Sequence, residues 1–197
     1  MKNICVFGAS NSSIPHIYVE TAYELGALLA EEGFGMVFGG GAVGLMGAAA
    51  EGVHAGGGTI TGVIPERLNH PGIASELCTE LIVTADMHER KALMEKLSSG
   101  FVILPGGYGT TEELMEVLTL KQLGYLDAPI LIINTNGFYN SLLEQFNRFV
   151  SDGFMNKRYL GLYKVVDSPS EAIDCIKNYH ADDMPDKIKE ALKKSDE

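Results

Sequence analysis

The chain has 197 residues, of which 46% are hydrophobic and 21% are charged, and its formal net charge is −11. No apolar run reaches the roughly 20 residues that span a bilayer, so we expect no membrane partner. The acidic balance also argues against a nucleic acid polymer as partner, because binding its phosphates needs clustered Lys and Arg.

Short β-rich runs alternate with longer helical patterns, which is typical of βαβ units that feed a mainly parallel sheet. In chain order we predict a strand over 3–7, a helix over 17–32, a strand over 35–38, a helix over 44–55, strands over 59–64 and 80–83, a helix over 87–98, a strand over 100–104, a helix over 110–124, a strand over 129–133, a helix over 139–152, a strand over 163–166 and a helix over 170–179. The runs 101–104 and 130–133 are apolar throughout, which favours central strands covered on both faces.

This order predicts an α/β fold with a doubly wound, mainly parallel sheet of about seven strands and helices on both faces. We find no internal repeat and no linker long enough to divide the chain, so residues 1–180 are predicted to form a single domain. Residues 181–197 are predicted to form a charged tail, with an amphipathic helix over 184–194.

The three cysteines and the first residues of the chain indicate the redox environment and the location to expect. Cys5, Cys78 and Cys175 lie far apart without metal-ligand spacing, so we expect packing residues, no disulfide framework and no metal site. The first residues enter a strand-like run directly, without the apolar segment and cleavage site of a signal peptide. We therefore expect a cytoplasmic protein.

The first glycine segment, residues 39–47, follows a predicted strand and precedes a predicted helix. Its GxGxxG spacing is weak by itself, because a NAD site would follow the first strand and place an acidic residue near the end of the next. Here the segment follows the second strand, the run 59–64 holds no Asp or Glu, and the Lys-Ser/Thr ending of a P-loop is missing. Its glycines, Gly40 and Gly41 among them, either contact a nucleotide or permit tight packing.

The second glycine segment, residues 105–113, follows the buried run 101–104 and opens a helix. Main-chain N–H groups and the helix dipole at such a junction attract a phosphate. Thr110 is also a candidate N-cap with Glu113 three residues later, a capping-box pattern that gives Glu113 a structural interpretation beside the functional one.

Residues 8–13 follow the first strand and offer further donors, Gly8 and Ser10 among them, to a phosphate or ribose, although turns use the same residue types. Ligands of doubly wound folds bind beyond the carboxyl ends of the strands. We therefore expect residues 8–13 and both glycine segments to meet on one rim of the sheet.

Asp86 is placed to cap the helix that begins at Met87, with Glu89 at the third helical position. Arg90 shares the expected inward face with Met87, Met94 and Leu97. It either extends along this face to solvent or pairs with an anion, for which Glu113 or a bound phosphate would serve. Lys91 is expected to face solvent.

At these residues the chain resembles the Lonely Guy family of cytokinin-activating phosphoribohydrolases. The family signature PGGxGTxxE stands at 105–113, and its MHERK-like segment stands at 87–91. The resemblance implies a Rossmann-like homodimer that hydrolyses the N-glycosidic bond of N6-substituted adenosine 5′-monophosphates to free base and ribose 5-phosphate, without a metal or redox cofactor. The family is also called lysine decarboxylase, but no pyridoxal phosphate site with a Schiff-base lysine is indicated here.

By motif position, the resemblance implies that Arg90 and Glu113 are the catalytic pair. It implies nucleotide contacts for Lys91, Gly106, Gly107, Tyr108, Gly109, Thr110, Thr111 and Glu112, and less specifically for Glu76 and Thr119. Breaking a ribosyl C–N bond develops positive charge at the anomeric carbon, and a carboxylate that also positions water stabilises this transition state. Glu113 is our candidate for the carboxylate, while Arg90 either orients it or binds a ligand anion.

Two other functions fit the same glycine segments. A non-catalytic carrier of a nucleotide or nucleotide cofactor uses such turns only to bind. An NAD(P)-dependent oxidoreductase is disfavoured by the missing acidic residue. The enzymatic hypothesis demands that the side chains of Arg90 and Glu113 meet beside a phosphate-sized hollow lined by main-chain amides.

Overall fold

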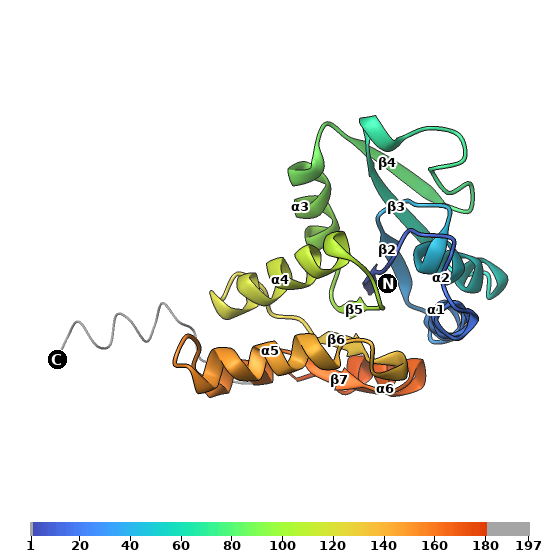
Figure 1. Ribbon diagram of the computed structural model, residues 1–197. Helices are drawn as coiled ribbons and strands as arrows, with labels where there is room; N and C mark the ends of the chain where they lie inside the picture. Colours follow the sequence, from blue (N-terminus) through green and yellow to red (C-terminus); the bar gives the residue numbers. More distant parts are fainter. Residues whose placement is uncertain (1, 181–197) are drawn as a thin grey trace.

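The structure is a computed structural model that describes residues 2–180 (Figure 1). Its strands form one sheet in the order β4-β3-β2-β1-β5-β6-β7, and every neighbouring pair is parallel. The strands are β1 (Asn3–Phe7), β2 (Gly35–Phe38), β3 (Ile60–Pro65), β4 (Glu80–Thr84), β5 (Phe101–Ile103), β6 (Ile130–Ile133) and β7 (Lys164–Val166). The predicted seven-stranded parallel sheet is confirmed.

Helices connect the strands in the predicted alternation. The α-helices are α1 (His16–Glu31), α2 (Gly44–Ala55), α3 (Met87–Leu97), α4 (Tyr108–Gln122), α5 (Asn140–Ser151) and α6 (Pro169–Lys177), with short 3-10 helices η1 (Glu66–Leu68), η2 (Thr135–Gly137) and η3 (Lys157–Leu162). Each strand and α-helix begins and ends within two residues of its predicted bounds. The helix predicted over 184–194 lies outside the described residues.

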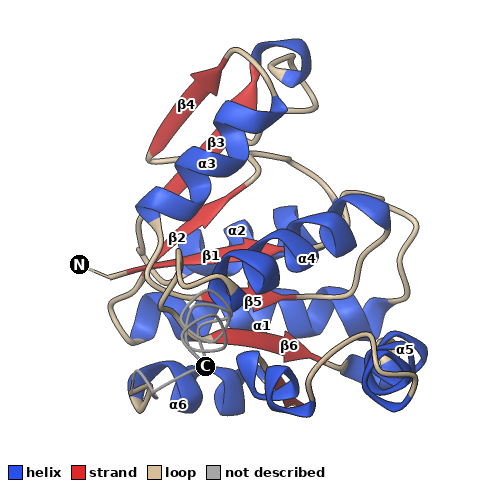
Figure 2. Cartoon of the chain, turned by 90° about the vertical axis from the view of Figure 1, so that its left-hand side faces the viewer, coloured by secondary structure: helices blue, strands red, loops and turns tan. Residues whose placement is uncertain are grey.

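Side chains of β1 alternate between two cores. Ile4 and Val6 pack in a core with α1, α2 and α6, whereas Cys5 and Phe7 pack in a core with α3, α4 and α5. All four are at most 3% exposed, because β1 has a strand on each side and helices on each face. Figure 2 shows α3 and α4 on the side of the sheet that faces the viewer. The predicted helices on both faces are confirmed.

The direction in which successive strands are added to the sheet reverses between β1 and β5. The chain adds β2, β3 and β4 on one side of β1 and then adds β5, β6 and β7 on the other side. Strands β5 and β6, expected to be central, do have neighbours on both sides, but β1 is the middle strand. The loops after β1, β2 and β5 therefore leave the same edge of the sheet beside this switch point, where open α/β sheets bind their ligands.

The three cysteines have packing positions. Cys5 lies in the second core, and Cys78 and Cys175 pack against the first core as free thiols. Across residues 2–180, no helix combines the length and the apolar character that crossing a membrane requires.

Candidate functional site

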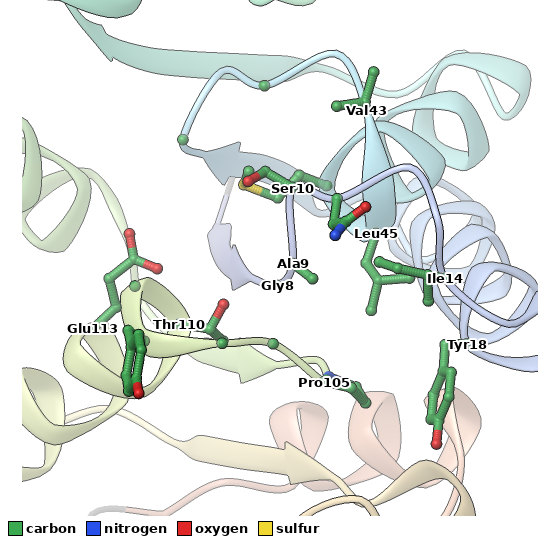
Figure 3. Close-up of a pocket in the computed structure, with 18 of the residues that line it drawn as sticks. Gly8, Ala9, Ser10, Ile14, Tyr18, Val43, Leu45, Pro105, Thr110 and Glu113 are labelled. Atoms are coloured by element: carbon green, nitrogen blue, oxygen red, sulfur yellow. The ribbon is translucent and has the colours of Figure 1, made fainter.

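A cavity of about 850 Å³ opens at the carboxyl ends of β1, β2 and β5 (Figure 3). Its wall includes parts of the loop after β1, the first glycine segment and the second glycine segment. Ten residues singled out from the sequence line it: Gly8, Ser10, Gly41, Arg90, Gly106, Gly107, Tyr108, Gly109, Thr110 and Glu113. The predicted meeting of the three segments on one rim is confirmed.

Main-chain hydrogen bonds join these three segments. The Leu45 N–H donates to the Ala9 carbonyl at 2.8 Å, and the Ala9 N–H donates to the Pro105 carbonyl at 3.1 Å. Gly44 permits this approach, since its φ is +71° and a Cβ there would lie 2.4 Å from the Ala9 oxygen. The main chain around the cavity is therefore held as one frame.

Three helices begin at the cavity without a side-chain cap. The N-cap positions are Pro15 for α1, Val43 for α2 and Gly107 for α4. At none of them does a side chain accept a hydrogen bond from an N–H group of the first turn. All three line the cavity. By contrast, Asp86 caps α3 as predicted and accepts two first-turn N–H groups. The Leu45 N–H of α2 is already paired with Ala9, but the other first-turn N–H groups without a side-chain cap and the three helix dipoles make this cavity attractive to an anion such as phosphate.

Arg90 reaches into the interior from the first turn of α3 and is 7% exposed. Its Nη2 lies 3.3 Å from Glu113 Oε1, and its Nε donates to the Val63 carbonyl at 3.2 Å. The guanidinium lies against Gly39, where a Cβ would be 2.0 Å from Nη2. The predicted meeting of Arg90 with Glu113 is confirmed. Gly39 was missed, although it is the first glycine after a predicted strand.

Glu113 lies inside α4 and is not part of a cap. The helix begins at Tyr108, two residues before its predicted start. Gly107 is the last residue with non-helical backbone angles, and Gly109 already lies inside the helix. Thr110 is the third residue of this helix, where it is 4% exposed and packs against Gly106, so it does not stand at the cap position. The predicted capping box is therefore wrong, and Glu113 falls in the second turn, where its side chain points toward the cavity.

Burial dominates the acid–base behaviour of Glu113, which is 8% exposed. Desolvation raises the pKa of this carboxyl to about 7, while Arg90 acts to lower the pKa and Glu112 adds to the rise. A carboxyl that titrates near neutrality beside a cavity is suited to take a proton from water.

Two side chains of α3 differ from expectation. Met87 is 42% exposed because it is the first residue of the helix, whereas Met94 is buried. Lys91 does not face solvent: its side chain is 11% exposed and forms ion pairs with Glu112 and Glu116 of α4. Burial acts to lower the pKa of Lys91, but these two carboxylates raise it above its usual value. Lys91 therefore ties α3 to α4 outside the cavity.

Six residues singled out from the sequence do not line this cavity: Gly40, Glu76, Lys91, Thr111, Glu112 and Thr119. Gly40 is buried, and a Cβ there would lie 3.2 Å from the Ile64 Cβ. The hydroxyls of Thr111 and Thr119 donate to carbonyls one turn earlier in the chain, at 3.0 and 2.7 Å. Glu76 is exposed in the loop before β4. Helix geometry and neighbouring side chains decide whether these residues face the cavity, and the spacing of a motif does not predict either of them.

Apolar side chains form much of the remaining wall, and sequence reasoning missed them. They include Ile14, Tyr18, Val43, Leu45, Met46, Ile64, Leu68, Ile73 and Phe138. Figure 3 shows Ile14 and Tyr18 on the side of the cavity opposite Glu113. The rings of Tyr18 and Phe138 meet edge to face, with centroids 6.0 Å apart. No local signal marks these residues, because each is ordinary in its own helix, strand or loop.

Among the described residues, no group of three or more His, Cys, Asp or Glu is placed to hold a metal ion. The wall instead combines main-chain N–H groups, the Arg90–Glu113 pair and an apolar side. This combination suits an organic ligand that carries an anionic group at one end and an apolar ring system at the other.

Fold and site together define a doubly wound α/β protein with an anion-attracting cavity at its switch point. The family model described as possible lysine decarboxylase matches residues 46–176. The cytokinin riboside 5′-monophosphate phosphoribohydrolase LOG1 of Arabidopsis thaliana is 41% identical over 194 residues, which are 98% of this chain and 89% of the relative. LOG7 of the same plant is 46% identical over 79% of this chain and 71% of its own length. The chain belongs to this family of phosphoribohydrolases, the Lonely Guy family.

Solved structures with the same fold include molybdenum cofactor proteins. The molybdenum cofactor binding protein of Rippkaea orientalis superposes with a TM-score of 0.70 at 24% identity, over 89% of this chain and 95% of that chain. The Moco carrier protein of Chlamydomonas reinhardtii superposes with a TM-score of 0.68 at 26% identity, over the same shares of the two chains. The Rossmann-like fold is thus shared between relatives named as enzymes and neighbours named as carriers.

Proposed function

We propose that this protein hydrolyses the N-glycosidic bond of adenosine 5′-monophosphates, N6-substituted ones included, and releases the free base and ribose 5-phosphate. The observation that carries the proposal is the buried Arg90–Glu113 pair beside a cavity rimmed by three uncapped helix N-termini. Membership of the Lonely Guy family supports the same reaction.

The second glycine segment is the proposed binding site of the 5′-phosphate. A Cβ at Gly107 or Gly109 would meet nothing within 4 Å, so the space beside these residues is open to a ligand. Their N–H groups lie at the uncapped start of α4, where the helix dipole favours negative charge. The apolar side around Tyr18 and Phe138 is the proposed place of the base.

Glu113 is the proposed catalytic carboxylate. Ionised Glu113 stabilises the positive charge that develops at the anomeric carbon and accepts a proton from the attacking water. The water oxygen forms a bond to that carbon, the ribosyl C–N bond breaks, and its electron pair leaves with the purine. Within residues 2–180 no second carboxyl group lines the cavity, so the balance closes when the proton that Glu113 takes from water passes to the departing purine and leaves Glu113 ionised again.

Arg90 is the proposed orienting residue for Glu113. Its Nη2 faces Oε1, and its Nε is held by the Val63 carbonyl, so the guanidinium keeps one position. It also opposes the effect of burial on the pKa of Glu113 and so favours the ionised form.

A non-catalytic carrier is the second candidate, favoured by the likeness to the molybdenum cofactor proteins. Lysine decarboxylation has less support, since no lysine among the described residues lines the cavity to form a Schiff base. Incubation with AMP and with N6-isopentenyl-AMP, followed by chromatography of the products, separates these functions. We expect adenine or the substituted base together with ribose 5-phosphate. Nucleotide binding without release of base would instead favour the carrier.

Several wider expectations belong to the same proposal: a homodimer, a cytoplasmic location, a single domain over residues 1–180 and no nucleic acid polymer as partner. For the homodimer, support comes from apolar side chains on α3 and α4 that are exposed in the single chain, with Met87 42%, Met115 38% and Tyr108 97% exposed. Sedimentation equilibrium tests it, and a monomer at micromolar concentration would contradict it.

A further inference from the structure

Tyr139 is a buried side chain directly behind the second glycine segment. It precedes α5 and is 2% exposed, and its hydroxyl donates to the Leu104 carbonyl at 2.8 Å. Leu104 is the last residue before Pro105 and the loop glycines. The phenol therefore links the connection after β6 to the point where the chain leaves β5.

Tyr139 is itself held from several directions. Its N–H donates to Asn134 Oδ1 at 2.8 Å, and Asn134 Nδ2 donates to Asn140 Oδ1 at 2.8 Å. The ring of Phe138, which lines the cavity, stands at 90° to the Tyr139 ring with centroids 5.0 Å apart. The hydroxyl of Tyr139 is thus a fixed donor rather than one end of a mobile side chain.

The peptide groups before Gly106 have hydrogen-bond partners outside the loop. The Leu104 N–H donates to the Phe7 carbonyl at 2.8 Å, and the Pro105 carbonyl accepts from the Ala9 N–H at 3.1 Å. Pro105 has no N–H of its own, so the peptide that joins it to Leu104 is oriented through the Leu104 carbonyl alone. Tyr139 holds that carbonyl with a side chain, whereas the other two bonds are made by main chain.

The hydroxyl keeps its proton over the whole working range of pH. Desolvation raises the pKa of Tyr139 well above its usual value, and a backbone hydrogen bond from Gly106 offsets only part of the rise. The donor role toward Leu104 is therefore permanent.

We propose that Tyr139 is a positioning residue that orients the peptide leading into Gly106–Gly109 and so preorganises the main-chain N–H groups that receive the 5′-phosphate. The inference rests on the proposed function for its ligand. Tyr139 acts through the loop and does not touch the nucleotide. Its effect should consequently fall on the phosphate and spare the nucleoside part of the ligand.

Calorimetric titration of the variant Tyr139→Phe with AMP and with adenosine tests this. We expect AMP to bind about tenfold more weakly than to the wild type, the loss that one hydrogen bond carries, with adenosine affinity unchanged. In turnover assays KM should rise by a similar factor while kcat stays within about twofold. Tyr159→Phe is the matched control, because Tyr159 is 6% exposed and does not line the cavity.

Equal losses for AMP and adenosine, or unchanged AMP affinity, would overturn the inference. So would a thermal midpoint of Tyr139→Phe far below that of Tyr159→Phe, since the hydroxyl would then serve the whole fold. Amide exchange of residues 106–109 in the ligand-free protein gives a second measurement, and faster exchange in Tyr139→Phe is expected. Both tests work in a protein that binds AMP without hydrolysing it, so failure of the proposed function leaves this inference measurable.

Discussion

The two glycine segments have similar composition, yet Gly44 and Gly47 of the first segment and Gly107 and Gly109 of the second are needed for opposite reasons, while Gly106 is packed against Thr110. In the first segment the protein itself fills the space: a Cβ at Gly44 would lie 2.4 Å from the Ala9 oxygen, and one at Gly47 would lie 2.4 Å from the Ala42 oxygen. In the second segment a Cβ at Gly107 or Gly109 would meet nothing within 4 Å. The first segment closes the frame of the site, and the second leaves room for the ligand.

The charged groups follow the same division. The first segment contributes a surface, Gly39, against which the Arg90 guanidinium lies. The second segment contributes the functional side chain, Glu113, on the helix that it opens. Substitutions in the first segment should therefore act mainly on stability, and substitutions in the second should act mainly on binding and turnover.

The largest expected effect is on turnover, when the carboxylate of the second segment is removed. Glu113→Gln should lower kcat by at least about 10³-fold, because an amide neither accepts the proton of the attacking water nor carries the negative charge that stabilises the anomeric carbon. Release of base from AMP measures it. Glu112→Gln is the control, since the Glu112 side chain is 54% exposed and pairs with Lys91 outside the cavity. Full activity in Glu113→Gln would remove the chemistry from this segment.

The second largest effect is expected on stability, from a substitution in the first glycine segment. Gly44→Ala should lower the free energy of unfolding by about 2–4 kcal/mol, because it adds both a strained φ and a clash with the Ala9 oxygen. Denaturant titration measures the change. Gly57→Ala isolates the strain, since Gly57 has a φ of +69° and open space around its Cβ position. Equal losses in the two variants would show that close approach is not what the first segment requires.

A smaller effect is expected where the ligand fits. Gly107→Ala should change the free energy of unfolding by no more than about 0.5 kcal/mol, because the added methyl meets no protein atom within 4 Å. AMP should bind about tenfold more weakly, since the methyl occupies space beside the phosphate site. Gly161→Ala, in similarly open space, is the control. Unchanged AMP affinity would place the phosphate elsewhere.

The last expected effect is gradual: the stability of the protein depends on pH. Burial raises the pKa of Glu113 from 4.5 to about 7, so the folded protein holds this proton more tightly than the unfolded chain does. The stabilising contribution is complete below pH 4.5 and is lost as the pH rises through 7. From about pH 5 to about pH 8, the wild type should lose on the order of 1–3 kcal/mol relative to Glu113→Gln.

The control for this titration is internal. Burial also raises the pKa of Glu95 to about 7, but Glu95 is present in both proteins and cancels in the difference. Over the same range kcat/KM of the wild type should rise, because ionised Glu113 is the reactive form. A stability difference that does not change with pH would mean that Glu113 titrates near its ordinary value in the folded protein.

Local patterns predicted the elements and the motif residues of the site well. The bounds of β1, β2 and α2 were predicted to the residue, because glycines and turn residues mark the ends of these elements. The start of α4 was placed two residues late, since Thr110 has the sequence pattern of a cap while its side chain is buried against Gly106. Lys91 was misplaced for a similar reason: its burial depends on Glu112 and Glu116, which another helix supplies.

By itself, the sequence determined the alternation of strands and helices, the parallel sheet and the motif positions of Arg90 and Glu113, because these depend on side-chain period and on residues close together in the chain. Only the tertiary structure decided which side chains wall the cavity, that Glu113 is buried enough to titrate near neutrality, and that Tyr139 reaches the Leu104 carbonyl. These properties depend on distances between segments far apart in the sequence, and such distances exist only once the sheet has brought its loops to one edge.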